Sequence, residues 1–454
     1  MMRMNSFTCS VFPKLRCSPS DWPIYLICLV SIACAAASGA DEPSITRLPI
    51  GLAYASDAVN TPVFRVSAVL TAAGHQFATY YAPDGSVVVA RREIGSTQWD
   101  VAVQPFKGKN YHDAHNDIVL GISSNGMLHL SYDHHSDPLH YRVSSKPYDI
   151  RSFGDIVPMT GQDELHVTYP QFIIAPDGTL YFFYRDGASG NGTLCLNRYD
   201  STAKTWQTIA HPLVDGENKC NPYWWRPAIS ADGTIHLAWC WRDSPDAASN
   251  HDLCYARSSD GGRTWQRSDG KPQQLPITQE NAEVVQPIKK GSNLINQCSA
   301  AVDALGNPHL AEYFNDADGS PQYFDVWFDG SKWHQSQVSH RPGKFHLGGG
   351  GTLAIPISRP EIAITHDGTV CLITRDADLG GGIRLYEAKA PYQNWTPIDL
   401  THEDLGNWEP SYDLARLHDD NVLSLFLLPV QQGNHERTTS FPPQQAVILE
   451  TPLP

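Results

Sequence analysis

The sequence predicts an all-β fold, a seven-bladed β-propeller with four antiparallel strands in each blade. The first observation is a short phrase, a turn of the Asp-Gly type followed by an alternating strand, that occurs seven times. The second is its spacing, because the turn glycines lie 41, 52, 55, 73 and 62 residues apart and the last, degenerate turn follows after 53. The third is composition: 33 Pro, 34 Gly, 12 Trp and 19 Tyr in 454 residues suit sheets joined by many turns. The turns are Asp84-Gly85, Asn125-Gly126, Asp177-Gly178, Asp232-Gly233, Gly306, Asp367-Gly368 and Asp420-Asn421.

Each blade is expected to begin with an inner strand just before its turn and to continue with a second strand just after it. The inner strands are predicted at 117–123, 170–175, 227–231 and 360–365. The outermost strand usually begins at a tryptophan, as at Trp99, Trp206, Trp265, Trp333 and Trp395. Pairing of 446–450 with 48–54 is expected to close the ring and to remove its open edge.

The segment 258–265 reads Ser-Ser-Asp-Gly-Gly-Arg-Thr-Trp and fits the Asp-box, a folded hairpin seen in many propellers. Its polar side chains satisfy the turn and its tryptophan packs between sheets, so we interpret it as structural. It indicates a propeller without indicating an activity.

The N-terminus has the pattern of an export signal. Arg3, Lys14 and Arg16 precede an apolar run at 22–37, and small residues then lead to Ala40. We therefore predict a signal peptide at 1–40, a single catalytic propeller domain at 41–454, and a secreted or periplasmic protein. Lipid attachment at Cys34 is the less favoured alternative, and the run is too short for a convincing membrane anchor.

The formal net charge of −15 and the sequence pI of about 5.6 argue against binding to nucleic acid or to an anionic membrane. An anionic substrate stays compatible with this charge, because a few cations focused in a groove can override the global field. We expect a monomer.

Polar side chains are predicted to converge on one face of the propeller. The inner and second strands of a blade are antiparallel, so the start of the first and the end of the second lie at the same end of the blade. His, Tyr and Arg occupy these ends in several blades, and such a concave polar rim is the default binding site. The residues are His115, Tyr169, Tyr223 and Arg359 at the starts, and His134, His135, Arg185 and Arg242 at the ends.

Two long motifs resemble the BNR-repeat propellers that include the ulvan lyases, polysaccharide lyases that act by β-elimination. One runs from His115 to Arg142 and contains His129-Leu-Ser-Tyr-Asp-His-His135, and the other runs from Thr168-Tyr-Pro to Gly192. The resemblance covers most of the mature chain. It implies catalytic roles for His115, His135, Tyr169 and Arg185, with a further tyrosine at Tyr223.

The chemistry of a lyase suits these residue types. Such an enzyme removes the C5 proton of a uronate and expels the sugar oxygen on C4. Arg185, with Arg242 in support, is expected to neutralise the carboxylate, His115 to act as base and Tyr169 as acid, with His135 assisting. Tyr169 serving as both base and acid is an open alternative. Tyr223, Arg242, His134 and Arg359 are expected to bind the substrate.

Cys240 and Cys254 flank a predicted hairpin whose loop contains His251. This arrangement suits either a disulfide or a zinc site, and His346 is a further candidate ligand. The resemblance implies a structural zinc, and no organic cofactor is expected.

The sequence thus predicts a secreted lyase that cuts an anionic, uronate-containing polysaccharide, similar to ulvan, within the chain. A propeller that binds glycans without cleaving them is the first alternative. A sialidase-type hydrolase is the second, although the chain has no early Arg-Ile-Pro-type segment of the kind that such an enzyme would need.

Overall fold

A computed structural model describes residues 44–453 of the chain. The predicted signal peptide at 1–40, its cleavage near Ala40 and the alternative lipid site at Cys34 lie outside the described residues, so they stay predictions. The described residues belong to one compact unit.

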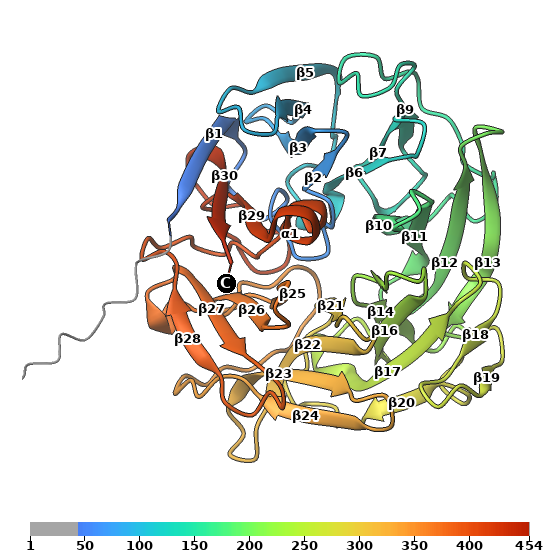
Figure 1. The fold of residues 1–454 in the computed structure, drawn as a ribbon, viewed down its shortest axis with the longest axis vertical. Coiled ribbons are helices and arrows are strands. Elements are labelled where there is room, and N and C mark those ends of the chain that lie inside the picture. Colours follow the sequence, from blue (N-terminus) through green and yellow to red (C-terminus); the bar gives the residue numbers. More distant parts are fainter. Residues whose placement is uncertain (1–43, 454) are drawn as a thin grey trace, which may run out of the picture. The chain divides into compact units, whose positions relative to one another are not determined.

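The strands form sheets that follow one another around a common centre, as the change of colour along the chain in Figure 1 shows. Three sheets have four strands, as predicted. They are β2 (Val69–Ala72), β3 (His75–Tyr81), β4 (Ser86–Glu93) and β5 (Asp100–Lys107); β21 (Ser299–Val302), β22 (Pro308–Asn315), β23 (Pro321–Phe328) and β24 (Trp333–Gln337); and β25 (Glu361–Ile364), β26 (Val370–Arg375), β27 (Ile383–Ala388) and β28 (Thr396–Asp399).

Three further sheets depart from four strands. One has three strands, one has five and one has seven: β6 (Ile118–Ile122), β7 (Leu128–Tyr132) and β9 (Tyr141–Val143); β8 (His135–Asp137), β10 (Val167–Ile174), β11 (Leu180–Ala188), β12 (Asn191–Asp200) and β13 (Thr205–Asp215); and β14 (Asn221–Trp224), β15 (Ala228–Ile229), β16 (Ile235–Arg242), β17 (Asn250–Ser258), β18 (Trp265–Gln266), β19 (Pro272–Gln273) and β20 (Glu283–Gln286). Short 3-10 helices lie at η1 (Ala114–Asn116), η2 (Ala247–Ser249) and η3 (Ala377–Leu379).

The last sheet is irregular. It consists of β1 (Thr46–Ala53), β30 (Gln444–Pro452) and β29 (Val422–Leu427). A short helix, α1 (Leu414–Asp420), lies where the pattern of the other sheets would have an inner strand. Asp413 caps this helix by accepting from the backbone N–H groups of Ala415 and Arg416, and Asn421 ends it in the left-handed conformation.

The prediction of an all-β propeller is therefore confirmed, whereas the prediction of seven four-stranded blades is wrong, because the structure has six blades and not all of them have four strands. Six sheets contain an inner strand of their own, and the number of strands varies from three to seven. The expected partnership of 446–450 with 48–54 is present as antiparallel pairing of β1 with β30, in which Leu48 faces Ile448 and Ala53 faces Gln444.

The repeated turns and the Asp-box have the roles that the sequence indicated. The turn glycines Gly126, Gly178 and Gly368 have φ values of 79°, 81° and 80°, which other residues rarely adopt. In the Asp-box, the Thr264 backbone N–H donates to Asp260 at 2.9 Å, and the buried Trp265 ring donates to the Gly262 carbonyl at 2.9 Å.

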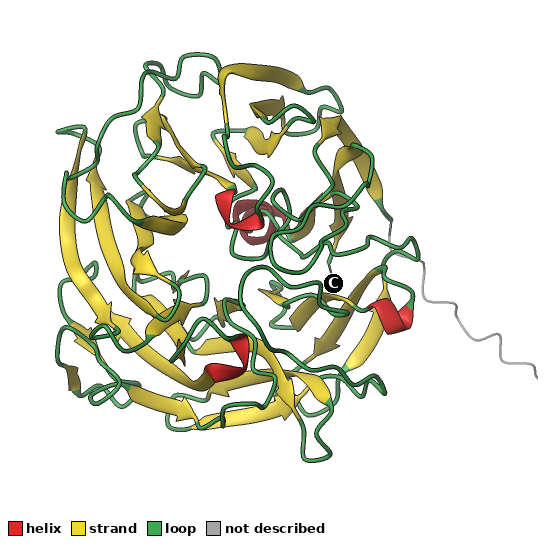
Figure 2. Ribbon diagram, turned by 180° about the vertical axis from the view of Figure 1, so that it is seen from behind, coloured by secondary structure: helices red, strands yellow, loops and turns green. Residues whose placement is uncertain are grey.

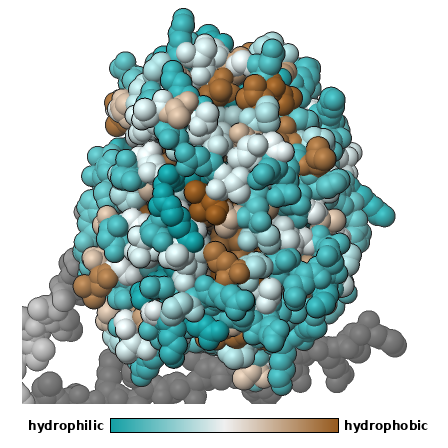
Figure 3. Space-filling view, turned by 90° about the vertical axis from the view of Figure 1, so that its right-hand side faces the viewer, coloured by the Kyte–Doolittle hydropathy of each residue, from teal (hydrophilic) through white to brown (hydrophobic). Residues whose placement is uncertain are grey.

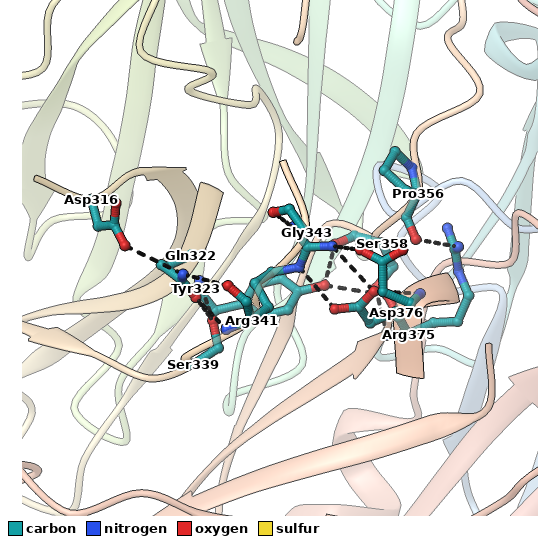
Figure 4. A network of polar contacts seen from close by, with 11 residues as sticks. Asp316, Gln322, Tyr323, Ser339, Arg341, Gly343, Pro356, Ser358, Arg375 and Asp376 are labelled. Carbon is teal, nitrogen blue, oxygen red and sulfur yellow. Dashed lines mark hydrogen bonds and ion pairs between the residues drawn. The ribbon is translucent and has the colours of Figure 1, made fainter. Parts of the chain in front are cut away.

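Polar contacts join two neighbouring sheets (Figure 4). Arg341 Nε donates to Asp376 at 2.8 Å, and the Tyr323 hydroxyl donates to the Ser358 carbonyl at 2.9 Å. These bonds connect the β21–β24 sheet to the β25–β28 sheet. They also anchor both ends of an irregular segment, residues 341–358, that contributes to the central cavity.

The flank seen in Figure 3 is mostly hydrophilic, with apolar side chains scattered over it. From the opposite side, Figure 2 shows loops that cross part of the centre of the ring. Among the described residues, no helix has both the length and the apolar character needed to span a membrane.

Candidate active site

A cavity of about 260 Å³ lies where the sheets converge. Seven of the eight residues predicted to line the rim do line this cavity: His115, His135, Tyr169, Arg185, Tyr223, Arg242 and Arg359. The exception is His134, whose predicted substrate contact is wrong. It is fully buried and its Nε2 accepts the backbone N–H of His140 at 2.7 Å, so it supports the turn after β7.

Two imidazoles and one carboxylate form the first part of the site. His115 and His135 are stacked with ring centroids 3.9 Å apart. The Nδ1 atom of His115 lies 2.7 Å from Asp113 Oδ1, and that of His135 lies 2.6 Å from Asp113 Oδ2. Because the carboxylate accepts at both Nδ1 atoms, it favours the tautomer with the proton on Nδ1 and leaves each Nε2 free to accept a proton.

The ionisation state of His115 suits a base. Burial, helped by the neighbouring His135, lowers the pKa of His115 to about 4, so this imidazole is neutral at pH 7. Burial opposes ionisation of Asp113, but His115 and His135 outweigh it and hold the pKa of this carboxyl below its usual range. Asp113 therefore stays an anionic acceptor.

Tyr169 is placed by a break in its strand. The pairing of β10 with β11 shifts between Thr168 and Gln171, and Tyr169 has a φ of 54°. Such a bulge redirects a side chain, and a non-glycine residue at positive φ is a strained feature that clusters at functional sites. Burial, with Tyr223 nearby, raises the pKa of Tyr169 above its usual range, so its phenol keeps its proton.

Arg185 is a buried cation of the cavity with unused hydrogen-bonding capacity. It lies on β11 opposite Thr168, is 1% exposed, and donates from Nη2 to Thr168 Oγ1 at 2.9 Å. Within residues 44–453, its Nε and Nη1 groups have no hydrogen-bond partner. Buried donors without partners are costly, so this guanidinium is poised to bind an anion in the cavity.

The other two predicted arginines are already engaged. Arg242 donates to Asn250 at 2.7 Å and to Asn296 at 2.5 Å, and its Nη1 lies 3.3 Å from the Tyr223 hydroxyl. Burial works against ionisation of Tyr223, but Arg242 and then Arg185 lower the pKa of its phenol overall. Arg242 thus contacts the Tyr223 hydroxyl and lowers the pKa of its phenol.

Arg359 forms an ion pair with Glu409, in which Nε lies 2.8 Å from Oε1. It lines the cavity, but its charge is already balanced by this carboxylate.

The predicted metal ligands do not come together. Cys240 faces Leu253 and Cys254 faces Trp239 across β16 and β17, so the two thiols point to opposite faces of the sheet. Both are free, which also contradicts the predicted disulfide. His251 contacts Asp252 at 2.9 Å and Asp243 at 3.1 Å, which raise the pKa of its imidazole and occupy both nitrogens.

The fourth predicted ligand, His346, lies on the surface within 341–358. Among residues 44–453, the one set of three metal-binding side chains with donor atoms within 4.8 Å of one another is Asp113, His115 and His135. The set predicted to hold zinc therefore does not fit the ion.

Two further residues of the site were missed. Asp113 lies two residues before His115, and this short distance along the chain was the available signal. Glu436 lines the cavity and has Oε1 3.7 Å from His115 Nδ1. It comes from an irregular segment more than 300 residues away, for which the strand pattern gives no signal.

The sequence model of the BNR repeat-containing family matches residues 75–341, which is more than half of the chain. An ulvan lyase from Alteromonas sp. (strain LOR) is 24% identical over 344 residues, which cover 64% of this chain and 68% of that protein. An ulvan lyase from Nonlabens ulvanivorans is 24% identical over 275 residues, 51% of this chain and 55% of that protein.

Solved structures share the fold. The polysaccharide lyase Uly1 superimposes with a TM-score of 0.66 at 16% identity, covering 85% of this chain and 89% of that one. An ulvan lyase bound to -[GlcA(1-4)Rha3S]- superimposes with a TM-score of 0.66 at 15% identity, covering 85% and 96%. At 15–16% identity, these superpositions establish a shared fold and nothing further.

Proposed function

This chain belongs to the BNR repeat-containing family, and from that premise we propose that it is an exported, monomeric polysaccharide lyase. Its proposed substrate is an acidic polysaccharide that contains uronate, similar to ulvan, which it cuts within the chain by β-elimination. The observation that carries the proposal is Arg185, a buried cation with two unpaired N–H donors beside two imidazoles whose Nε2 atoms are free.

The proposed reaction uses three groups of the cavity. Arg185 binds the uronate carboxylate and offsets the charge that grows on it when the C5 proton leaves. His115 takes this proton at Nε2, the electron pair forms the C4–C5 double bond, and the C4–O bond breaks. Tyr169 donates its phenolic proton to the departing oxygen, and solvent then carries the proton from His115 back to Tyr169.

The ionisation states support this division of roles. A neutral His115 accepts a proton at pH 7, and a protonated Tyr169 donates one. The high pKa of Tyr169 also disfavours the alternative in which it is both base and acid. His135 is proposed to assist by holding the orientation of His115 through Asp113.

The two alternatives make different demands on the cavity. A sialidase-type hydrolase would need three arginines free to bind one acid group, whereas Arg359 is paired with Glu409 and Arg375 donates to backbone carbonyls at 2.9–3.3 Å. A glycan-binding propeller would use the same cavity without turnover. It is distinguished from a lyase by whether bound polymer becomes shorter.

The test is incubation of the purified protein with ulvan, alginate, pectin and glycosaminoglycans. A lyase releases products with a conjugated enoate, which absorbs in the ultraviolet, and an endo-acting one lowers the average chain length early. Arg185→Ala and His115→Ala should each abolish turnover, while Arg198→Ala, on the neighbouring strand of the same sheet, should keep the parent rate. Absence of ultraviolet products on every polymer, or parent rates in either cavity variant, would contradict the proposal.

A further inference from the structure

One aromatic side chain, Phe64, contacts both groups that the proposed reaction uses to move protons. It lies in the irregular segment 54–68 between β1 and β2, lines the cavity of about 260 Å³ and is 5% exposed. Its ring is stacked on His115, with centroids 6.0 Å apart and an angle of 24° between the planes. It meets Tyr169 edge-on, with centroids 4.9 Å apart. Phe64 thus forms a shared wall beside the proposed base and the proposed acid.

An ion pair holds this ring from the neighbouring sheets. The guanidinium carbon of Arg359 lies 5.0 Å from the centroid of Phe64, which is the geometry of a cation–π contact. Glu409 accepts from Arg359 Nε at 2.8 Å and from the backbone N–H of Val63 at 2.9 Å. One carboxylate therefore fixes both the cation that lies over the ring and the residue next to the ring in the chain.

The residue that follows Phe64 is anchored as well. Arg65 is fully buried, and it donates from Nε to the Ile118 carbonyl at 2.9 Å and from Nη1 to the Asn60 carbonyl at 2.6 Å. Phe64 therefore lies between two residues that are tied to different parts of the fold. An aromatic ring held on both sides in this way is a rigid part of the cavity wall.

The surroundings of His115 explain what an apolar wall does there. The charged and titratable groups that face its imidazole come from five elements: Asp113 at the cap of η1, His135 on β8, Tyr169 on β10, Arg185 on β11 and Glu436 in the irregular segment before β30. Phe64 adds apolar surface to this set. Burial lowers the pKa of His115 to about 4, and an apolar ring beside an imidazole excludes the water that would stabilise its charged form.

The same ring limits the movement of Tyr169. The Tyr169 ring has Phe64 at 4.9 Å, Tyr223 at 5.8 Å and Trp224 at 6.2 Å between centroids, and the guanidinium carbon of Arg185 lies 5.0 Å from its centroid. The backbone of Tyr169 is in the left-handed region, so the packed rings have to hold the direction in which its phenol points.

We propose that Phe64 is a positioning residue of the site, which keeps water away from His115 and fixes the phenol of Tyr169, and that the Arg359–Glu409 ion pair holds Phe64 in place. This inference rests on the proposed lyase activity, because it assigns Phe64 to the base and the acid of that reaction. It also gives Arg359 a function other than the substrate contact expected from the sequence.

The test measures kcat and KM from pH 3.5 to 8 for the parent protein, Phe64→Leu and Phe64→Ala. Loss of the ring admits water and stabilises the imidazolium, so the acid limb of kcat/KM should move to higher pH, by about one pH unit in Phe64→Leu and further in Phe64→Ala. At pH 8, where His115 is neutral in every variant, kcat should be about tenfold lower because Tyr169 has lost one side of its packing. Phe64→Leu keeps most of the apolar volume, so the test does not depend on the folding of Phe64→Ala.

Phe106→Leu is the matched control. The Phe106 ring is partly buried, stacks on Tyr132 at 5.4 Å and has the guanidinium carbon of Arg142 4.1 Å from its centroid, but it does not line the cavity. This substitution removes the same kinds of contact away from the site, so it should keep the parent limb and rate. A structural disturbance that merely lowered the amount of folded protein would reduce the rate without moving the limb.

The ion pair has a test of its own. Arg359→Lys keeps a positive charge opposite Glu409 and removes the planar guanidinium from the Phe64 ring. It should move the acid limb in the same direction as Phe64→Leu but by less. The double variant should add little to Phe64→Leu, because both substitutions act through one ring. Shifts that add fully would overturn the part assigned to Arg359 and Glu409.

An NMR titration separates this inference from the proposed function. Histidine labelled with carbon-13 at Cε1, with the His115 signal identified by its loss in His115→Gln, reports the pKa of His115 without any substrate. If no polymer is cleaved but this pKa rises in Phe64→Leu, the lyase assignment fails and the exclusion of water by Phe64 is supported. If ulvan is cleaved but Phe64→Leu leaves both this pKa and the acid limb unchanged, or moves them to lower pH, the lyase assignment is supported and the inference about Phe64 is overturned.

Discussion

At the scale of single residues, Asp113 controls the two imidazoles of the site. It accepts from both Nδ1 atoms at 2.6–2.7 Å and also from the His115 backbone N–H at 2.9 Å as the cap of η1. One carboxylate thus sets the tautomer of both rings and fixes the backbone that holds one of them. Asp113 contacts both Nδ1 atoms and does not itself line the cavity of about 260 Å³, so it is a positioning residue for the proposed base.

The pH dependence of activity tests this role. The pKa of His115 is lowered to about 4, and the proposed base works in its neutral form, so kcat/KM should hold down to about pH 4 and fall below it. An ordinary imidazole would give this fall near pH 6.5. The negative charge of Asp113 favours protonation of His115, so Asp113→Asn should move the acid limb to lower pH and reduce kcat by about 100-fold or more.

The measurement is kcat and KM from pH 3.5 to 8 for the parent protein, for Asp113→Asn and for the exposed control Asp155→Asn. A substitution that only disturbed folding would change stability without moving the limb. An acid limb near pH 6.5 in the parent, or an unmoved limb in Asp113→Asn, would contradict the assignment of His115 as base.

At the scale of elements, the site depends on one strand that leaves its own blade. β8 lies between β7 and β9 along the chain, yet it pairs with β10 in the next sheet, where His135 faces Thr168. Thr168 Oγ1 accepts the Ser136 N–H at 2.8 Å and the Arg185 Nη2 at 2.9 Å. A single hydroxyl therefore joins the strand that carries His135 to the side chain of Arg185.

Thr168→Val preserves the shape of this side chain and removes the hydroxyl. It leaves the Ser136 N–H and one Arg185 donor without an acceptor, so we expect the free energy of unfolding to fall by about 1–3 kcal/mol. We also expect kcat/KM to fall by as much as about 100-fold, because small displacements of a positioned group carry such costs. Chemical denaturation and the ultraviolet assay measure the two effects.

The matched control is Thr208→Val, on the exposed surface of the same sheet. It should change neither quantity appreciably. Full activity in Thr168→Val at reduced stability would show that the hydroxyl serves the fold alone.

Local pattern was enough to predict most of the sheets and the main groups of the cavity. Turns such as Asp177-Gly178 mark where strands reverse, and counting from them brought His115, Tyr169 and Arg185 to one end of the blades. The pattern could not show that His135 lines the cavity while His134 is buried. This difference depends on β8, which pairs with the next sheet and not with its own.

Other features depend on register or on contacts far apart in the chain. A shift of one residue decides whether Cys240 and Cys254 share a face, and sequence alone does not determine that register. The helix α1 replaced an inner strand because Asp413 caps it, a signal that the repeat pattern concealed. Glu436 reaches His115 through an irregular segment without periodicity.

At the scale of the whole molecule, the two ends of the described chain meet in one sheet. β1 pairs with β30 over Thr46–Ala53, and β30 pairs in turn with β29. We propose that this pairing closes the ring. In a closed ring every sheet has two neighbours, so loosening one junction weakens the packing of all the others.

Leu48 and Leu52 offer a matched pair for testing closure, because both lie on β1. Leu48 is 3% exposed, whereas Leu52 is 59% exposed. Leu48→Ala should lower the free energy of unfolding by about 2–5 kcal/mol, the usual cost of a cavity at a buried leucine. Leu52→Ala should change it by no more than about 0.5 kcal/mol.

Hydrogen exchange then distinguishes closure from local fraying. If β1 and β30 close the ring, Leu48→Ala should accelerate exchange in distant sheets such as β10–β13, because their slowest amides open only when the whole ring opens. If the terminal strand is an independent attachment, faster exchange should be confined to β1, β30 and β29. That confined pattern, together with an unchanged rate in β10–β13, would contradict the proposed closure. If Leu48→Ala also kept its activity, the site would not depend on this junction.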